Sequence, residues 1–413
     1  GYIVVMSDYP GLGNDTSRIH TFCHAESLGS AVSLMIDKAI PFIVEKSNKT
    51  NVSWNGQIFL AGHSEGAYAT MAAAKYIQEN PSLFRYYSID NIRGVAAISG
   101  PYDLSGEMRN VFLNNSYSKL EYLPYIIYGY NEIYEKDKSK ELYHFIENVQ
   151  DIFKNNPDEN NYGELFETAL KSEDDGDKEE RILRIFEGLT RPDQVFTQEF
   201  IDIIATEDSK YTLALKENDL YNTWVPEMPV YLIHSIHDEV VPIGNSYKAA
   251  SHFRENGVDI KTDWIEKWFN FEADHGKSYM EGFDRTRTWV DGLKEKALIQ
   301  VLSYPNNGGE VRIAEEEWGN NVSKQVGVGK KVEIECRNNE NSEFYGWFEN
   351  GRFLSKANPF LLDVTDDREI EARFEQPKYT LTLEKSPSLG GSVTGDGDYH
   401  AGESVNISAT PNT

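Results

Sequence analysis

The sequence predicts an α/β fold with a parallel sheet, a helical cap inserted between two of its strands, and a C-terminal tail of all-β repeat modules. Three observations predict it. Short apolar runs alternate with helical patterns in residues 1–98 and again in 229–296, as in parallel α/β sheets. The block 104–226 between them is rich in Tyr, Glu and Lys and shows no convincing buried strand. Beyond about residue 300, Gly, Asn, Thr and alternating β-branched residues indicate short strands.

The N-terminal part is predicted to contain three strands and two helices. The run Tyr-Ile-Val-Val-Met at 2–6 lacks polar alternation and is predicted to be a buried strand covered on both faces. The other elements follow as a helix over about 25–46, a strand over 57–61, a helix over 66–79 and a strand over 92–98.

The cap is predicted over about 104–226, with helices near 119–150, 160–189 and 197–205. Within it, the acidic stretch 171–180 is most simply a solvated turn and the start of a helix. The sheet then resumes as a strand over 229–235, a helix over 244–256, a strand over 260–268 and a closing helix over 277–296.

The tail contains an internal repeat. Two copies are aligned by matching residues 308–311 with 390–393 and residues 329–334 with 402–407. Such repetition indicates an array of small modules. We therefore expect an α/β domain at 1–298 with the cap at 104–226, a β-repeat module at 299–376 and a truncated second module at 377–413.

Composition excludes several classes of function. No run approaches the ~20 apolar residues of a membrane-spanning helix, so no transmembrane segment is expected. A net charge of −27 disfavours nucleic acid and acidic membrane surfaces as partners. Cys23 and Cys336 fall in different predicted domains, so we expect free thiols and neither a disulfide framework nor a zinc site. No metal or other cofactor is expected.

Both ends of the sequence bear on its extent. Gly1 is not an initiator Met and begins a predicted strand, and residues 409–413 stop where the repeat would continue. We interpret the sequence as a fragment at both ends.

The strongest local motif is Gly62-His63-Ser64-Glu65-Gly66, which follows an apolar strand and precedes an Ala-rich helix. A serine on a sharp strand-to-helix turn takes strained backbone angles, and small residues two before and two after it relieve the crowding. The motif therefore predicts Ser64 as a nucleophile. The helix N-terminus and the backbone N–H of Glu65 would face a developing oxyanion.

A nucleophilic serine on this fold needs an acid and a base, in the chain order Ser, Asp or Glu, His. Asp238 and His275 each lie in a loop at the C-terminal end of a predicted strand, where the catalytic groups of open α/β sheets gather. The order predicts Asp238 as the acid and His275 as the base. Glu239 is a rival acid, and Asp274 a weaker one.

The remaining candidates are interpreted as packing or surface residues. His63 occupies the variable position of the serine turn, and His237 precedes the acid. Asp8 and Tyr9 follow the first predicted strand and could line the site, but turn and packing roles are favoured. The Tyr-rich segment 122–128 could line an acyl pocket, although such a stripe is more often core. The other histidines interpreted as surface or packing residues are His20, His24, His144, His252 and His400.

These motifs, with residues 1–13 and Gly-Pro-Tyr-Asp-Leu-Ser-Gly at 100–106, resemble the secretory lipase family of α/β-hydrolases over about residues 1–296. The resemblance implies a serine carboxylic ester hydrolase, of esterase or lipase type, with Ser64, Asp238 and His275 as its triad and a helical lid over the site. It also implies that the N-terminal strands of the sheet, and the loop giving the second oxyanion donor, would precede Gly1.

The tail is similar to the divergent internalin-B-type β-repeats of bacterial surface and secreted proteins. This resemblance implies an extracellular or cell-surface location and attachment to a cell surface or glycan.

Two alternatives stay open. A serine peptidase of the prolyl-oligopeptidase type shares the fold, the triad order and similar serine turns, although the helical insertion after Pro101 favours the esterase. A surface binding protein with an inactive hydrolase domain is the other alternative, which the three intact triad residues argue against.

Overall fold

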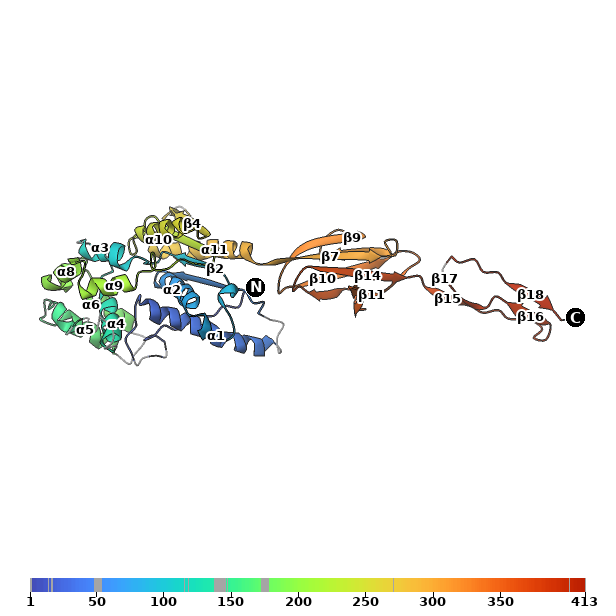
Figure 1. The fold of residues 1–413 in the computed structure, drawn as a ribbon, viewed down its shortest axis with the longest axis horizontal. Coiled ribbons are helices and arrows are strands. Elements are labelled where there is room, and N and C mark those ends of the chain that lie inside the picture. The colour runs from blue at the N-terminus through green and yellow to red at the C-terminus, as the bar shows by residue number, and fades with distance from the viewer. Residues whose placement is uncertain are drawn as a thin grey trace. The chain divides into compact units, whose positions relative to one another are not determined.

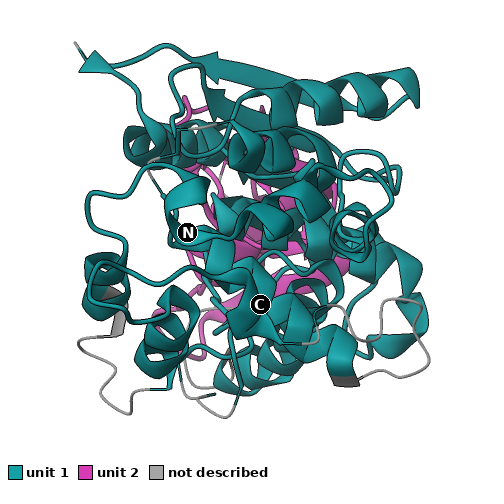
Figure 2. Ribbon diagram, turned by 90° about the vertical axis from the view of Figure 1, so that its left-hand side faces the viewer, with its two compact units in different colours: residues 1–293 teal, residues 294–413 magenta. Residues whose placement is uncertain are grey.

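A computed structural model describes residues 2–13, 15, 18–47, 54–114, 116–117, 119–136, 146, 148–171, 178–269, 271–400 and 402–412. The chain divides into two compact units, Gly1–Leu293 (unit 1) and Lys294–Thr413 (unit 2), shown in teal and magenta in Figure 2.

Unit 1 is built on a four-stranded parallel sheet with the strand order β1-β2-β3-β4. All six residues of β3 are buried, as expected for a strand covered by helices on both faces. The sheet confirms the predicted parallel α/β class. Its strands are β1 (Ile58–His63), β2 (Ile92–Ile98), β3 (Val230–Ser235) and β4 (Ile260–Ile265).

Helices cover the two faces of this sheet. In β2, Val95 and Ala97 belong to the same core as α2, whereas Ala96 and Ile98 pack in a second core with α11 residues such as Trp289. This alternation follows the two-residue period of a strand. The long helices are α1 (Ala25–Ser47), α2 (Glu65–Glu79), α10 (Gly244–Glu255) and α11 (His275–Leu293). Two short 3-10 turns, η1 (Pro81–Leu83) and η2 (Ile89–Asn91), connect α2 to β2.

Helix α1 is the one described helix that is long and apolar enough to cross a membrane, by length and composition. Helix α1 also packs on α2, and an added Cβ at its Gly29 would lie only 2.7 Å from Ala72 O. The carbonyl oxygen of Ser33 in α1 accepts a hydrogen bond from the Tyr87 hydroxyl. A core helix of a globular domain meets the same test, so the absence of a transmembrane segment stays a prediction.

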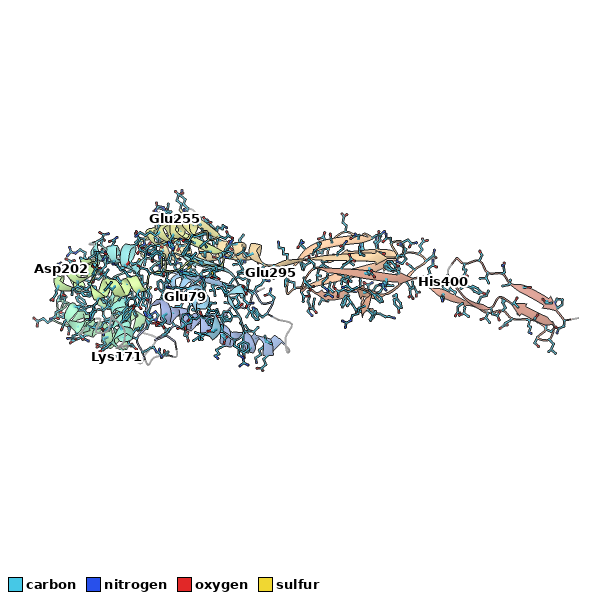
Figure 3. All side chains as sticks on the ribbon, viewed as in Figure 1. Glu79, Lys171, Asp202, Glu255, Glu295 and His400 are labelled. Atoms are coloured by element: carbon cyan, nitrogen blue, oxygen red, sulfur yellow. The ribbon has the colours of Figure 1, made fainter. Side chains whose placement is uncertain are left out.

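The block between β2 and β3 folds into a cap of short helices (Figure 1). Among its described residues, strand pairing is limited to two isolated bridges, Phe153↔Phe196 and Asn155↔Asn161. Buried aromatic rings form the interior of the cap, while charged residues such as Asp202 lie on its surface (Figure 3). The elements are η3 (Leu104–Met108), α3 (Arg109–Leu113), α4 (Tyr122–Lys136), η4 (Val149–Ile152), α5 (Tyr162–Leu170), α6 (Lys178–Ile185), α7 (Pro192–Val195), α8 (Gln198–Ala205) and α9 (Lys210–Glu217).

Besides residues 115, 118 and 147, two longer parts of the predicted cap lie outside the described residues. These are residues 137–145 of the helix expected near 119–150 and residues 172–177 of the acidic stretch. His144 belongs to the first of them.

The predicted strand at residues 2–6 is wrong. Residues 2–9 form no strand, and the side chains of Val4 and Met6 are 76% and 86% exposed. A strand needs a neighbour that pairs with its N–H and C=O groups, and the described sheet pairs β1 with β2 alone. Apolar composition therefore did not suffice to make this segment a strand.

The predicted strand at 260–268 is divided. Strand β4 ends at Ile265, and β5 (Lys267–Trp268) then pairs with β6 (Phe271–Glu272) in a small antiparallel hairpin. Helix α11 begins at His275 and ends at Leu293, so it starts and ends slightly earlier than the predicted span of 277–296.

Unit 2 consists of β-strands, as the tail composition predicted. A three-stranded sheet in the order β13-β10-β8 and a five-stranded sheet in the order β12-β11-β14-β7-β9 share one apolar core. Trp347 lies in this core without exposed surface, and its Nε1 donates to Ala357 O over 2.8 Å. The strands are β7 (Lys296–Tyr304), β8 (Gly309–Ile313), β9 (Asn321–Gly327), β10 (Lys331–Asn338), β11 (Glu343–Glu349), β12 (Arg352–Ser355), β13 (Phe360–Asp363) and β14 (Arg368–Glu375).

The second copy reproduces the strand pairing of the first. In the first copy Lys296 pairs with Gly327, and Lys378 pairs with His400 in the second. These partners correspond in the sequence alignment of the repeats, as do the pairs Val311↔Cys336 and Val393↔Ala409. The repeat is therefore one of strand register as well as of sequence. Its second copy comprises β15 (Lys378–Leu381), β16 (Gly391–Thr394), β17 (Gly397–His400) and β18 (Ser408–Pro411).

Candidate active site

Ser64 lies at the turn between β1 and α2 in a strained backbone conformation, with φ 56° and ψ −124°. This left-handed φ is costly for a residue with a side chain. An added Cβ at Gly62 would lie 2.0 Å from the carbonyl oxygen of Gly66, so the chain passes too close to itself for a larger residue. The small residue two positions before Ser64 thus has a direct steric cause, whereas an added Cβ at Gly66 would meet only the Tyr9 hydroxyl at 3.7 Å.

The three residues predicted as a triad lie in hydrogen-bond contact. His275 Nε2 is 2.9 Å from Ser64 Oγ, and His275 Nδ1 is 2.7 Å from Asp238 Oδ2. Because the carboxylate can only accept, Nδ1 carries the hydrogen and Nε2 is free to accept the Ser64 proton. The arrangement holds an imidazole in the tautomer of a general base.

Asp238 is held by its own loop. Its Oδ1 accepts hydrogen bonds from the backbone N–H groups of Val240 and Val241 over 3.0 and 2.7 Å. The side chain has no exposed surface. Burial raises the pKa of this carboxyl, but hydrogen bonds from His234 and His275 outweigh it and hold the pKa well below the usual range. Asp238 is therefore a charged acceptor at neutral pH.

His234 is a residue of this site that sequence reasoning missed. Its Nε2 lies 3.4 Å from Asp238 Oδ2 and donates to Val241 O over 2.9 Å, while Nδ1 accepts from Ser246 Oγ over 2.7 Å. His234 has no exposed surface. It lies near the same carboxylate oxygen of Asp238 that His275 contacts, and its place at the end of a buried strand resembled that of a core residue.

His63 packs against His275 and contacts its backbone. Its Nε2 is 3.0 Å from the backbone oxygen of His275 and 3.1 Å from Ser278 Oγ, and the two histidine rings lie 4.7 Å apart. Burial and the positive charge that His275 can carry lower the pKa of His63 to about 4, so it stays neutral at physiological pH. The residue on which His63 packs is His275, the candidate base.

The two rival acids, Glu239 and Asp274, make contacts with groups other than the His275 imidazole. Glu239 Oε2 accepts from the backbone N–H of His275 over 3.1 Å, and the Asp274 carboxylate pairs with Lys277. Nδ1 of the His275 imidazole is paired with Asp238.

Glu65 is the first residue of α2 and follows Ser64 directly. Its backbone N–H therefore lies at a helix N-terminus, a position that favours negative charge. Its side chain is fixed by contacts from an N-terminal segment. Glu65 Oε1 lies 2.8 Å from His20 Nε2 and accepts from the backbone N–H of Cys23 over 3.3 Å. His20 is 45 residues away in sequence, and no local signal indicated this contact.

Tyr9 takes the packing role predicted for it. Its ring stacks on that of His20 with centroids 6.1 Å apart, and burial beside the Glu65 carboxylate raises its pKa to about 12.

A mostly apolar cavity connects Ser64 with the cap. Ser64 and Glu65 line it on one side, and cap side chains line the other. From the Tyr-rich segment, Tyr122, Leu123 and Ile126 line the cavity, whereas Ile127 is fully buried in the core. Other apolar lining residues are Leu104, Met108, Phe112, Ile204 and Leu215.

Within the part of the chain that the structure describes, no group of three or more His, Cys, Asp or Glu side chains is arranged to hold a metal ion. Both cysteines are free and buried.

Two segments of the chain match known families. Residues 182–296 match the secretory lipase family, and residues 381–413 match the divergent InlB B-repeat domain. Both matches confirm the resemblances that the sequence predicted. The first contains Asp238 and His275, and the second contains most of the second repeat copy. No curated protein matches the chain.

Solved structures that are similar to this chain include a hydrolase, an esterase and a lipase. A candidate hydrolase from Legionella pneumophila is 22% identical, with a TM-score of 0.55 over 71% of this chain and 70% of its own. The rice cell wall degrading esterase LipA from Xanthomonas oryzae is 19% identical, with a TM-score of 0.49 over 69% and 67%. Lipase A of Candida antarctica in its closed state is 16% identical, with a TM-score of 0.44 over 66% and 55%. The first likeness confirms the α/β-hydrolase fold.

Proposed function

We propose that the chain is a serine carboxylic ester hydrolase that acts through an acyl-enzyme on Ser64, with His275 as base and Asp238 as acid. The observation that carries this proposal is the continuous hydrogen-bonded series from Ser64 Oγ through His275 to Asp238. The secretory lipase match at residues 182–296 supports an ester hydrolase.

In the first half-reaction, Ser64 Oγ attacks the ester carbonyl carbon while His275 Nε2 takes the hydroxyl proton. Asp238 stabilises the resulting imidazolium through Nδ1–H. The carbonyl oxygen becomes an oxyanion, which the backbone N–H of Glu65 and the N-terminus of α2 stabilise. When the intermediate collapses, the C–O bond to the alcohol breaks, and the leaving alkoxide takes the proton from Nε2.

In the second half-reaction, water attacks the acyl-enzyme carbonyl and gives its proton to His275. The bond to Ser64 Oγ then breaks, and Ser64 recovers the proton as the carboxylic acid leaves. The apolar cavity beside Ser64 is suited to an acyl chain, because burying methylene groups is favourable. A small-molecule or lipid ester is thus the proposed substrate.

The test is hydrolysis of p-nitrophenyl esters from acetate to palmitate by the protein and by Ser64→Ala. Ser251→Ala is the matched control, because Ser251 is exposed on α10. Loss of at least about 10⁴-fold in kcat for Ser64→Ala alone is expected. Labelling by a fluorophosphonate should add one phosphonyl group at Ser64.

Other outcomes identify other functions. Cleavage of peptides but not esters would indicate a peptidase of the prolyl-oligopeptidase type. Failure on both, with Ser64 unlabelled in folded protein, would leave a binding role.

We also propose that the protein is secreted or displayed on a bacterial surface, where the β-repeats attach it to a cell-wall or surface glycan. The divergent InlB B-repeat match supports this role. Cosedimentation with purified cell walls should be lost when Trp347→Ala opens the unit 2 core. Equal binding to cell walls by the protein and by Trp347→Ala would contradict the attachment role.

A further inference from the structure

Arg109 is a charged residue in the mostly apolar cavity beside Ser64, which Glu65 also lines. It is the first residue of α3 and lines the cavity together with Phe112 and Ile204. Its side chain is only 10% exposed. A guanidinium in such a place needs acceptors for its N–H groups, since arginine is always charged.

The structure provides an acceptor for only part of the guanidinium. Nη2 donates to Glu207 Oε1. Nε and Nη1 of Arg109 are buried and have no hydrogen-bond partner. Three N–H donors, one on Nε and two on Nη1, therefore lack an acceptor. Buried donors without partners are rare in native proteins and favour binding of a ligand that supplies an acceptor.

Arg109 shares the carboxylate of Glu207 with a second cation. Glu207 Oε2 lies 3.6 Å from Lys216 Nζ, so the cations of Arg109 and Lys216 share one carboxylate. The nearest acid in sequence, Glu107, lies 3.1 Å from Lys248 instead. Within the group of Arg109, Lys216 and Glu207, two cations share one carboxylate, and an incoming anion would supply a second negative charge.

The position of Glu207 also limits the cost of bringing an anion here. Its side chain is 65% exposed, which places the Arg109 end of the cavity near solvent. A carboxylate bound there would be paired with a guanidinium without complete loss of hydration, the condition under which ion pairs are favourable. The aliphatic part of the same ligand would contact Phe112 and Ile204.

We propose that the cavity binds esters whose acyl chain ends in a carboxylate, so that Arg109 holds this carboxylate while Ser64 attacks the ester carbonyl. The substrate class is the half-esters of aliphatic dicarboxylic acids. This inference rests on the proposed ester hydrolysis at Ser64 and adds to it a determinant for the far end of the acyl group.

The first test compares matched p-nitrophenyl esters of four to twelve acyl carbons, ending in either a methyl group or a carboxylate. At the best-fitting length, kcat/KM for the carboxylate series should exceed that for the methyl series by at least about tenfold. Arg109→Met should reverse this preference. Arg184→Met is the matched control, because Arg184 is exposed and paired with Glu180 on α6. A methyl preference at every length, or a preference unchanged in Arg109→Met, overturns the proposal.

A second variant guards against misfolding of Arg109→Met. Glu207→Gln removes the competing carboxylate at an exposed position and leaves Arg109 in place. The carboxylate preference should rise by several-fold, and an unchanged or smaller preference overturns the proposal.

Binding to Ser64→Ala separates this inference from the proposed function. Calorimetry with methyl half-esters of dicarboxylic acids, against methyl esters of monocarboxylic acids of equal length, should give a Kd at least about tenfold lower for the half-ester. The double variant Ser64→Ala/Arg109→Met should lose this difference. Arg109-dependent binding in a protein that hydrolyses no ester would refute the hydrolase and retain the site. Hydrolysis without any Arg109-dependent preference would refute the site alone.

Discussion

Replacing Asp238 with Asn is expected to abolish nearly all ester hydrolysis and to leave the fold intact. Oδ1 accepts from the backbone N–H groups of Val240 and Val241, and an amide oxygen can keep both bonds. Oδ2, which accepts from His275 Nδ1 at 2.7 Å, would become an NH₂ group. Two donors would then face each other across this contact.

The size of the effect follows from the tautomer. To accept from the new NH₂ group, the imidazole must move its hydrogen from Nδ1 to Nε2, and Nε2 can no longer take the Ser64 proton. The same change of tautomer in serine proteases lowers kcat about 10⁴-fold, which corresponds to about 5.4 kcal/mol of activation free energy. Rotating the amide gives no relief, because its NH₂ group would then face the N–H groups of Val240 and Val241. We expect the full loss.

The assay is kcat for a p-nitrophenyl ester at pH 7.5 for the protein, Asp238→Asn, Asp274→Asn and Glu239→Gln, with thermal melts on all four. The two neighbouring variants should keep kcat within about threefold, because neither carboxylate contacts the imidazole. If Asp238→Asn keeps more than a tenth of kcat, or either neighbour loses more than it does, the assignment of the acid is refuted.

Three further changes test other features. Gly62→Ala should lower kcat by at least about 100-fold, because its Cβ would lie 2.0 Å from Gly66 O. Gly292→Ala is the control: its Cβ would have nothing within 4 Å, and the change should raise the Tm slightly. Similar behaviour of the two variants would argue against a steric role for Gly62. Burial raises the pKa of Asp219 from the usual 3.8 to about 6. The folded protein then holds this proton more tightly than the unfolded chain, and the stability falls by up to about 3 kcal/mol as the pH rises from 4 to 6; Asp219→Asn should remove this fall in chemical denaturation, and an unchanged slope would contradict it. Trp347→Ala should destabilise unit 2 by about 3–5 kcal/mol with kcat unchanged, and a parallel loss of kcat would show that the units do not act independently.

The proximity of the three site residues could be predicted from sequence because topology dictates it. Ser64, Asp238 and His275 follow β1, β3 and the hairpin after β4, and the carboxyl ends of parallel strands share one edge. Chain order and strand ends were therefore enough to select these three from the nine histidines and many acids of the chain.

The second layer of the site could not be predicted in this way. His234 contacts Asp238, Val241 and Ser246, and His20 contacts Glu65. These pairings depend on the paths of loops, which no periodicity encodes. Likewise, the apolar run at 2–6 carries the composition of a strand, but strand formation depends on a hydrogen-bonding neighbour rather than on composition.

The parallel pairing of β14 with β7 determines how the chain travels through the first repeat module. Arg368 lies beside Ile299 and Arg373 beside Tyr304, so the last strand runs in the same direction as the first. The chain therefore leaves the module at the opposite end from the one at which it came in, displaced by roughly 25 Å for a strand of this length. A module of this kind therefore separates the segment that enters it from the segment that leaves it by about the length of one strand.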